Sequence, residues 1–294
     1  MKSGFVAIIG RPNAGKSTLL NAFTGEKIAV ISDKPQTTRN NILGIVNGKG
    51  SQVVFMDTPG IHSPKNKLGK FMVKEAENST KGVDVIVLVV SIYDNPSVND
   101  SIIENIKNSG VPVILAINKT DTCEKETILP LILSYSEKME FDEIIPVSAL
   151  KGDGVKLVYD EILKRLGEGP MYFPEDMITD QPERQIVAEI IREKALWCLD
   201  KEVPHGIAVE ITEFKENDNG TVYIGATINC EKKTHKGIII GKNGSMLKKI
   251  GQKARIDCEE FFGTKVFLEL WVKIKEDWRD SDFLIKQFGF DSKQ

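Results

Sequence analysis

The sequence predicts an α/β fold in which a domain with a mostly parallel β-sheet is followed by a smaller α+β domain. Two continuous apolar runs, residues 5–9 and 113–117, are typical of buried parallel strands, and glycine or polar residues follow each at once. Residues 207–214 and 221–228 instead alternate apolar and polar side chains, which is typical of a hairpin with one buried face. The 294 residues, 41% of them apolar, suffice for two modest cores.

The turn after the first strand reads Gly-Arg-Pro-Asn-Ala-Gly-Lys-Ser at residues 10–17 and opens a helix expected to reach Phe23. A strand, a glycine-rich loop and a helix N-terminus form a phosphate cradle, because backbone N–H groups face the anion. Lys16 would bridge the β- and γ-phosphates of a nucleotide, and the Ser17 hydroxyl would bind Mg²⁺. Taken alone, the pattern also fits a glycine-rich turn. The expected nucleotide contacts are Gly10, Arg11, Pro12, Asn13, Ala14, Gly15, Lys16, Ser17 and Thr18.

Residues 118–121, Asn-Lys-Thr-Asp, follow the second apolar run, at the edge where open α/β sheets bind ligands. The Asp121 carboxylate only accepts hydrogen bonds, which suits the N1–H and N2–H₂ donors of guanine. Adenine has no matching donors and would leave the carboxylate unpaired at a cost in free energy. Residues 146–150 form a further short segment, whose Ala149 N–H is expected at the guanine O6. The predicted base-side contacts of this GTP/GDP site are Asn118, Lys119, Asp121, Ser148, Ala149 and Leu150.

Residues 57–60, Asp-Thr-Pro-Gly, end another apolar strand. We expect Asp57 to hold Mg²⁺ through a water and the Gly60 N–H to reach the γ-phosphate. A threonine from the preceding polar loop should complete the metal shell; Thr38 is the first choice and Thr37 the alternative. The predicted magnesium ligands are therefore Ser17, Thr38 and Asp57, the predicted catalytic residues are Lys16, Thr38 and Gly60, and Thr58, Pro59 and Ile61 complete the expected nucleotide contacts.

The charge distribution is uneven, although the charged fraction of 28% and the net charge of −3 are ordinary. Residues 231–255 contain eight basic residues and one acid, whereas residues 168–218 contain thirteen acids and five bases. A basic segment within an acidic chain predicts one surface that faces nucleic acid.

Four cysteines, Cys123, Cys198, Cys230 and Cys258, show no Cys-x-x-Cys spacing, so neither zinc nor a disulfide is expected. The longest apolar run, residues 85–90, is far shorter than the about 18 residues needed to cross a bilayer. The N-terminal residues enter the first strand directly, which predicts a cytoplasmic protein.

Residues 168–182 contain three prolines and clustered acids, which predicts a linker between a domain at residues 1–167 and another at residues 183–294. A helix should open the second domain at residues 183–199, a third strand should follow at residues 266–272, and a helix should end the chain. In the first domain, periodicity further predicts a hairpin at 42–46 and 52–56, a strand at 83–90, and helices at 96–109, 123–139 and 156–166.

Residues 241–244, Gly-Lys-Asn-Gly, form a G-x-x-G loop that opens an amphipathic helix within the basic stretch. Phosphates would meet the loop N–H groups, and Ile238, Ile239 and Ile240 would line a groove for bases. The alternative is a small α+β domain whose lysines are merely solvated. The predicted RNA contacts are Lys236, Ile239, Ile240, Gly241, Lys242, Asn243, Gly244, Lys248 and Lys249.

The segments from the phosphate loop to residues 146–150 resemble, in order and spacing, the five motifs of translation-factor-like P-loop GTPases. Ile61 stands where Ras-like members carry a water-orienting glutamine, so another group must assist GTP hydrolysis. Asn13, together with Gln-Thr-Thr-Arg at residues 36–39, resembles the subfamily that places K⁺ beside the phosphates; this implies Asn13 as a potassium ligand, with an ordinary turn residue as the alternative. The G-x-x-G loop, with two strands before it and one after, resembles a type II KH domain, which implies single-stranded RNA as the ligand.

Over its whole length the chain resembles the Era family of bacterial GTPases, most specifically at residues 36–39, 173–176, 190–194 and 268–273. The resemblance implies hydrolysis of GTP to GDP and phosphate, binding of the 3′ end of 16S ribosomal RNA, and help in assembling the 30S subunit. It also implies peripheral association with the inner membrane, and we expect a monomer. One alternative is a GTPase that regulates a modification or membrane complex, with the C-terminal domain as a protein-docking module. A small-molecule kinase is disfavoured by residues 118–121 and by the lack of an acceptor-binding lid.

Overall fold

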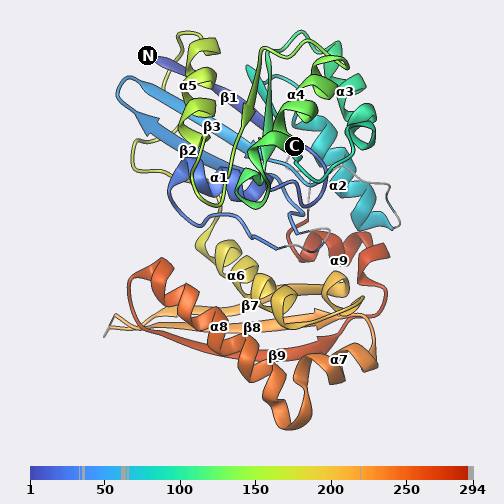
Figure 1. Ribbon diagram of the computed structural model, residues 1–294. Helices are drawn as coiled ribbons and strands as arrows, with labels where there is room; N and C mark the ends of the chain where they lie inside the picture. The colour runs from blue at the N-terminus through green and yellow to red at the C-terminus, as the bar shows by residue number, and fades with distance from the viewer. Residues whose placement is uncertain (33, 35–36, 61–63, 65, 219, 291–294) are drawn as a thin grey trace. The chain divides into compact units, whose positions relative to one another are not determined.

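The structure is a computed structural model that describes residues 1–32, 34, 37–60, 64, 66–218 and 220–290. These residues form two compact units (Figure 1). The first lies within Met1–Ser63 and Met72–Asp180, and the second lies within Pro64–Phe71 and Gln181–Gln294. The predicted order, an α/β domain followed by an α+β domain, is confirmed.

The first unit is built on a six-stranded sheet in the order β2-β3-β1-β4-β5-β6. β2 pairs antiparallel with β3, as the hairpin prediction required, and the other neighbouring strands are parallel. The carboxyl ends of the parallel strands therefore lie along one edge, where ligands of such sheets bind. The strands are β1 (Lys2–Ile9), β2 (Ile42–Gly48), β3 (Ser51–Asp57), β4 (Val85–Ser91), β5 (Val113–Asn118) and β6 (Glu143–Pro146).

The helices predicted at residues 96–109 and 123–139 are shorter than expected. The periodicity analysis did not identify the helix α2 (Lys67–Asn78). Leu68, Met72 and Ala76 are buried on α2 at intervals of four residues, a pattern that would have predicted it. Residues 96–99 form a 3₁₀ turn before α3, which shortens that helix. The helices are α1 (Lys16–Thr24), α2 (Lys67–Asn78), α3 (Asp100–Lys107), α4 (Ile128–Ser136) and α5 (Val155–Arg165).

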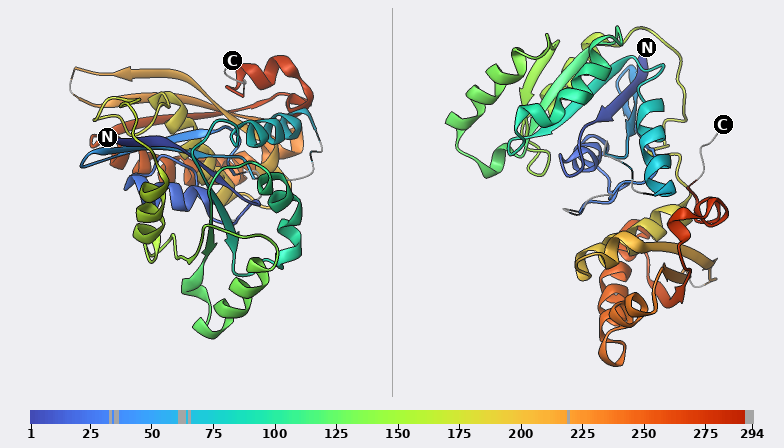
Figure 2. Two further views of the ribbon diagram at one scale, coloured as in Figure 1. Left: turned by 90° about the horizontal axis from the view of Figure 1, so that it is seen from above. Right: turned by 90° about the vertical axis from the view of Figure 1, so that its right-hand side faces the viewer.

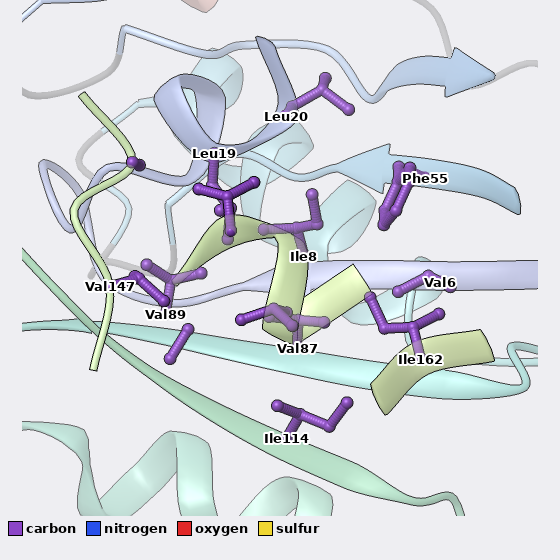
Figure 3. Close-up of a cluster of buried hydrophobic side chains, with 14 of the residues drawn as sticks. Val6, Ile8, Leu19, Leu20, Phe55, Val87, Val89, Ile114, Val147 and Ile162 are labelled. Atoms are coloured by element: carbon purple, nitrogen blue, oxygen red, sulfur yellow. The ribbon is translucent and has the colours of Figure 1, made fainter. Parts of the chain in front are cut away.

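Each face of this sheet has its own core, because alternate residues of a strand point to opposite faces. Ile8 of β1 packs with Leu19 of α1 and Ile162 of α5 (Figure 3). Its neighbour Ile9 joins a second cluster with buried residues of α3 and α4. Figures 1 and 2 show the backbone of these helices beside the sheet. Burial of both faces explains why the strands are continuously apolar and leaves the strand ends as the place for a site.

The segment after α5 is fastened to the β2–β3 edge of the first unit. Gln52 of β3 is completely buried; its side-chain oxygen accepts from the N–H groups of Tyr172 and Phe173 at 2.7 and 3.0 Å. Its amide donates to the Phe173 carbonyl oxygen at 2.8 Å, and the Ile45 N–H donates to the Ile178 carbonyl oxygen at 2.8 Å. Hydrogen bonds to its backbone groups therefore hold this stretch of the predicted linker against the first unit.

The second unit has a three-stranded sheet in the order β7-β8-β9, with β7 and β8 antiparallel and β8 and β9 parallel. Its core joins apolar residues from α6, α8 and one face of this sheet. The predicted helix, hairpin and third strand are all present. The elements are α6 (Glu183–Cys198), β7 (Ile207–Glu216), β8 (Val222–Cys230), α7 (Lys233–Ile240), α8 (Ser245–Phe262), β9 (Val266–Ile274) and α9 (Asp282–Gln287). Over the described residues, no helix combines the length and apolar character that crossing a bilayer requires.

Candidate nucleotide and nucleic-acid sites

Two glycines let the loop after β1 approach its neighbours closely. Gly10 has a φ of +148°, and a Cβ there would lie 2.2 Å from the Val89 carbonyl oxygen. Gly15 has a φ of +96°, and its Cβ would lie 2.1 Å from Asn118 Nδ2. Helix α1 begins directly afterwards at Lys16, so its free N–H groups face this loop. The result is a backbone cradle for phosphate that any side chain at either glycine would distort.

Lys16 is a nearly completely buried cation at the start of α1. Its Nζ donates a hydrogen bond to the Arg11 carbonyl oxygen at 3.1 Å. Burial lowers the pKa of Lys16, and the negative charge of Asp57 opposes that shift. An ammonium has three donors, so phosphate oxygens bound here would both use this capacity and compensate for the desolvation.

Ser17, Thr38 and Asp57 meet at the end of β3, although they lie far apart in the sequence. The Ser17 hydroxyl lies 2.6 Å from Asp57 Oδ2 and 2.8 Å from Thr38 Oγ1. Thr38 Oγ1 lies 3.3 Å from the same carboxylate oxygen. Burial raises the pKa of Asp57, while the Lys16 ammonium and hydrogen bonds from the two hydroxyls act in the opposite direction.

This oxygen cluster has the chemistry of a magnesium site. Hydroxyl and carboxylate oxygens are the ligands that Mg²⁺ prefers. Asp57 Oδ1 is buried and has no hydrogen-bond partner within the described part of the chain, so the cluster has acceptor capacity left for a cation or its water shell. Thr37 instead donates to the Lys34 carbonyl oxygen. The geometry therefore favours Thr38 over Thr37 as the threonine ligand.

Asn118 and Ser148 organise the base side of the site. Asn118 Nδ2 donates to the Ala14 carbonyl oxygen at 2.9 Å, and its Oδ1 accepts from the Ala149 N–H at 3.0 Å. One side chain thus ties β5 to the phosphate loop and to the segment after β6. Ser148 Oγ donates to Asp121 Oδ1 at 2.6 Å, which orients the carboxylate expected to contact guanine. Because Asn118 already accepts from the Ala149 N–H, a bound guanine O6 would have to share or replace that bond.

A cleft of about 330 Å³ lies at the phosphate loop; among the described residues predicted for the base side, Lys119 lines it, whereas Asn118, Asp121 and Ser148 do not. The phosphate loop and the start of α1, the predicted Thr37 and Thr38, Gly60 and Lys119 all line it. Gly60 lies so close to the loop that a Cβ would be 2.7 Å from the Pro12 nitrogen. Thr58 and Pro59 are buried behind Gly60, Leu150 is largely exposed, and Ile61 lies outside the described residues.

Residues 30–32 form a wall of this cleft that the sequence analysis missed. Asn21 of α1 holds the segment just before them: its Nδ2 donates to the Ala29 carbonyl oxygen at 2.9 Å. Its Oδ1 accepts from the N–H groups of Ile28 and Ala29 at 3.1 and 2.9 Å. The signal in the sequence was a polar side chain within the apolar stretch of residues 19–23, but only its hydrogen-bond partners show what it does.

We predict that Asn21→Ala speeds nucleotide release about tenfold, because it leaves the buried Ala29 N–H unpaired, at a cost of about 1–3 kcal/mol, and loosens the cleft wall; the Ile28 N–H keeps its bond to the Glu26 carbonyl oxygen. Stopped-flow release of a fluorescent GDP measures this. Ser136→Ala, which removes a helix side-chain hydrogen bond on α4, is the control and should leave the release rate unchanged. A lower melting temperature without faster release would mean that Asn21 only stabilises the fold.

The G-x-x-G loop joins α7 to α8 with left-handed backbone at three of its four residues. Gly241, Asn243 and Gly244 have φ values of +72°, +51° and +78°. A Cβ at Gly241 would lie 2.7 Å from the Met246 Cβ, so this glycine is required for the close turn. Lys242 is exposed at the tip of the loop, where a phosphate backbone could reach it together with the first turn of α8.

A cleft of about 370 Å³ lies between α8 and β9, beginning at Gly244. Leu268 and Leu270 of β9 provide its apolar wall, and Lys248 and Arg255 of α8 its positive charge. The structure differs here from the expectation that residues 238–240 line the base groove. Ile239 is completely buried in the core, Ile240 is half-buried and Ile238 is exposed, because a helix presents consecutive residues in different directions. Lys236 is half-buried and Lys249 is exposed.

Comparison with known proteins identifies the family of this chain. Residues 5–119 match the family model described as 50S ribosome-binding GTPase, and residues 202–279 match the KH domain model. The chain is 55% identical to the GTPase Era of Ruminiclostridium cellulolyticum over 98% of its own length and 97% of that protein. The chain belongs to the Era GTPase family. An Era GTPase of Clostridium botulinum is 54% identical over 98% of both chains.

Two solved Era structures share the fold over 99% of each chain at 44% identity. One is a variant of Aquifex aeolicus Era bound to GDP and AlF₄⁻, with a TM-score of 0.95. The other is Era in complex with MgGDPNP and nucleotides 1506–1542 of 16S ribosomal RNA, with a TM-score of 0.94. The predicted family, fold class and GTPase activity of this Era-family chain are thereby confirmed.

Proposed function

We propose that this GTPase is a GTP-controlled switch that binds the 3′ end of 16S ribosomal RNA and assists assembly of the 30S subunit. The observation that carries the proposal is the presence, in one chain, of a cleft lined by the phosphate loop, Thr38 and Gly60 and of an exposed, basic G-x-x-G loop beside a partly apolar groove. The Era relative solved with Mg-nucleotide and 16S RNA supports the same assignment. Exposure of Lys242, Lys248 and Lys249 favours RNA over the alternative of a protein-docking module, for which a covered basic stretch would have been expected.

In this proposal the chain's own groups position the triphosphate. Lys16 pairs with β- and γ-phosphate oxygens, the N–H groups of the phosphate loop cradle the β-phosphate, and the Gly60 N–H contacts the γ-phosphate. Ser17, Thr38 and Asp57 would hold Mg²⁺, which when bound neutralises charge on the phosphate oxygens. These residues orient the phosphates and stabilise charge, which is most of what phosphoryl transfer requires of a protein.

We further propose that Asn13 is a potassium ligand. It lies in the phosphate loop with a φ of +64° and lines the nucleotide cleft. An added cation there would supply positive charge that Ras-like proteins obtain from an arginine finger. We expect GTP hydrolysis to be at least about tenfold faster in KCl than in NaCl for this reason.

The matched variant is Asn13→Gly, since glycine keeps the left-handed backbone while removing the side-chain oxygen. It should lose the potassium acceleration but keep its affinity for GDP. Equal hydrolysis rates in the two salts for the unmodified protein would rule out the potassium role.

The RNA proposal is tested by binding of a labelled RNA with the 16S 3′-terminal sequence, against a scrambled RNA of equal length and composition. We expect the native sequence to bind about tenfold or more tightly, as base contacts in the groove add to phosphate contacts. Equal affinities would show a general RNA-binding protein. We also propose that the protein is a monomer, with a GTPase domain at residues 1–167, a linker at 168–182 and a KH domain at 183–294; light scattering tests the oligomeric state. We propose that it is cytoplasmic and contacts the inner membrane peripherally, which cell fractionation tests.

A further inference from the structure

The three-stranded sheet has a second face that turns away from α6 and α8. Ile224, Ala226 and Ile228 of β8 point into the core, so the residues that alternate with them point to the opposite side. Gly225 confirms this direction: a Cβ there would lie 3.2 Å from the Glu213 Cβ and 3.3 Å from Trp271 Cζ3. Ala208, Thr227 and Asn229 of this side are buried; we name its exposed and half-buried part the outer sheet face, formed by Glu210, Glu213, Lys215, Tyr223, Phe267, Glu269, Trp271 and Lys273.

Aromatic side chains dominate the outer sheet face. Phe267 is 55% exposed and Trp271 is 45% exposed, although both are large and apolar. The Tyr223 and Phe267 rings are stacked, with centroids 5.6 Å apart and planes inclined by 13°. Exposed aromatic groups that gather on a rigid strand surface are typical of binding sites, since Trp, Tyr and Phe are enriched at interfaces.

The charged residues that lie between the aromatic rings indicate which class of ligand this face can bind. The outer sheet face carries three glutamates against two lysines, and Glu213 is paired with Lys215 at 2.5 Å, so Glu210 and Glu269 are its remaining carboxylates; residues 232–255 instead carry eight basic residues and no acid. Glu269 accepts a hydrogen bond from the Tyr223 hydroxyl at 2.8 Å, which holds its carboxylate among the rings. At one end of the face, Glu210 accepts from Gln287 of α9 at 3.1 Å. A phosphate backbone would be repelled by these carboxylates, so base stacking by RNA is disfavoured.

We propose that the outer sheet face docks an arginine-rich segment of a partner polypeptide. A guanidinium stacks on Trp and Phe rings and pairs with carboxylates through a planar fork, and this face offers both groups side by side. Phe267, Glu269 and Trp271 recur at every second residue of β9, which spaces them by about 6.6 Å. An extended segment with arginine at alternate positions repeats at the same distance, so three successive guanidinium groups meet Phe267, Glu269 and Trp271, and the segment ends before Lys273.

The test uses the full chain and a labelled five-residue peptide of alternating arginine and serine, whose three arginines match the outward-facing Phe267, Glu269 and Trp271 of β9. We expect Trp271→Ala and Glu269→Gln each to weaken peptide binding about threefold to fivefold, the size of one exposed cation–π or ionic contact. Phe283→Ala removes a 75% exposed aromatic side chain from α9 and should leave the affinity unchanged. A peptide with glutamine in place of arginine should bind weakly to every variant.

Circular dichroism establishes that the variants are folded, and GTP hydrolysis should be unchanged in all of them. Equal peptide affinity for the unmodified chain and Trp271→Ala would overturn the proposal, as would equal binding of the glutamine peptide. If Trp271→Ala instead weakened binding of single-stranded RNA and not of the peptide, the face would be a base-stacking surface. The peptide measurement contains no RNA, so its outcome is independent of the proposed ribosomal role.

Discussion

Asp121→Asn should lower the affinity for GTP about 10²- to 10⁴-fold and create a preference for xanthosine triphosphate. The carboxylate is expected to accept two charge-assisted hydrogen bonds from guanine, each worth about 1.5–3 kcal/mol. An amide would present a donor to one of those guanine donors, whereas the C2 oxygen of xanthine accepts from it. Ser148 Oγ, 2.6 Å from Asp121 Oδ1, can orient the amide as it orients the carboxylate. Competition of GTP, ATP and xanthosine triphosphate against fluorescent GDP measures the change.

Asp153→Asn is the matched control, because Asp153 is an exposed carboxylate in the loop that also contains Ser148. It should leave the nucleotide preference unchanged. An Asp121→Asn variant that still preferred GTP, or an unmodified protein that bound ATP as tightly as GTP, would contradict the assignment of Asp121 to the base.

Replacing Lys242 and Asn243 together with aspartate should weaken RNA binding about 100-fold and flatten its dependence on salt. Two carboxylates would stand where phosphates must lie, and the field of the nearby Lys248 would be partly cancelled. Fewer counterions would be released on binding, so the slope of log K against log salt should fall by about one for each lost phosphate contact. RNA affinity at several salt concentrations gives both quantities.

The fold should survive this change, because Gly241 and Gly244 keep the left-handed backbone of the loop. Asn217→Asp with Lys265→Asp is the control: it alters the same number of charges at exposed positions around the β7–β8 turn and the start of β9. GTP hydrolysis without RNA should be normal in both variants. If the loop substitutions left the RNA affinity unchanged, the loop would not be the RNA-binding site. Loss of GTPase activity in the absence of RNA would show that the two sites are not separate.

The sequence was sufficient wherever a few neighbouring residues determine the chemistry. The phosphate loop, the Asn118–Asp121 segment and the G-x-x-G loop are each short and continuous in the sequence, and the glycines of the two loops indicate the backbone conformation that each requires. Strand positions were also predictable, because strands buried on both faces are continuously apolar and the β7–β8 hairpin alternates. The ends of helices were less accurate, as the 3₁₀ turn before α3 shows.

Features that depend on distant partners could not be predicted in this way. Thr37 and Thr38 are equivalent in the sequence, and only the contacts of Thr38 with Ser17 and Asp57 separate them. Nothing in the sequence distinguishes Asn21 and Gln52 from other polar residues, and only the structure shows the backbone N–H groups that donate to them. Each of these side chains acts through groups that folding brings to it, so no local pattern marks them.

By itself, then, the sequence determined the nucleotide, the two-domain order and the family, because these depend on short motifs with fixed backbone requirements. The tertiary structure decided which threonine joins Ser17 and Asp57, which isoleucines are buried beside the G-x-x-G loop, and where aromatic rings and glutamates form the outer sheet face. The physical reason is the same in each case: a side chain's environment is set by the direction in which its backbone points it and by the residues packed opposite, and both are consequences of the whole fold.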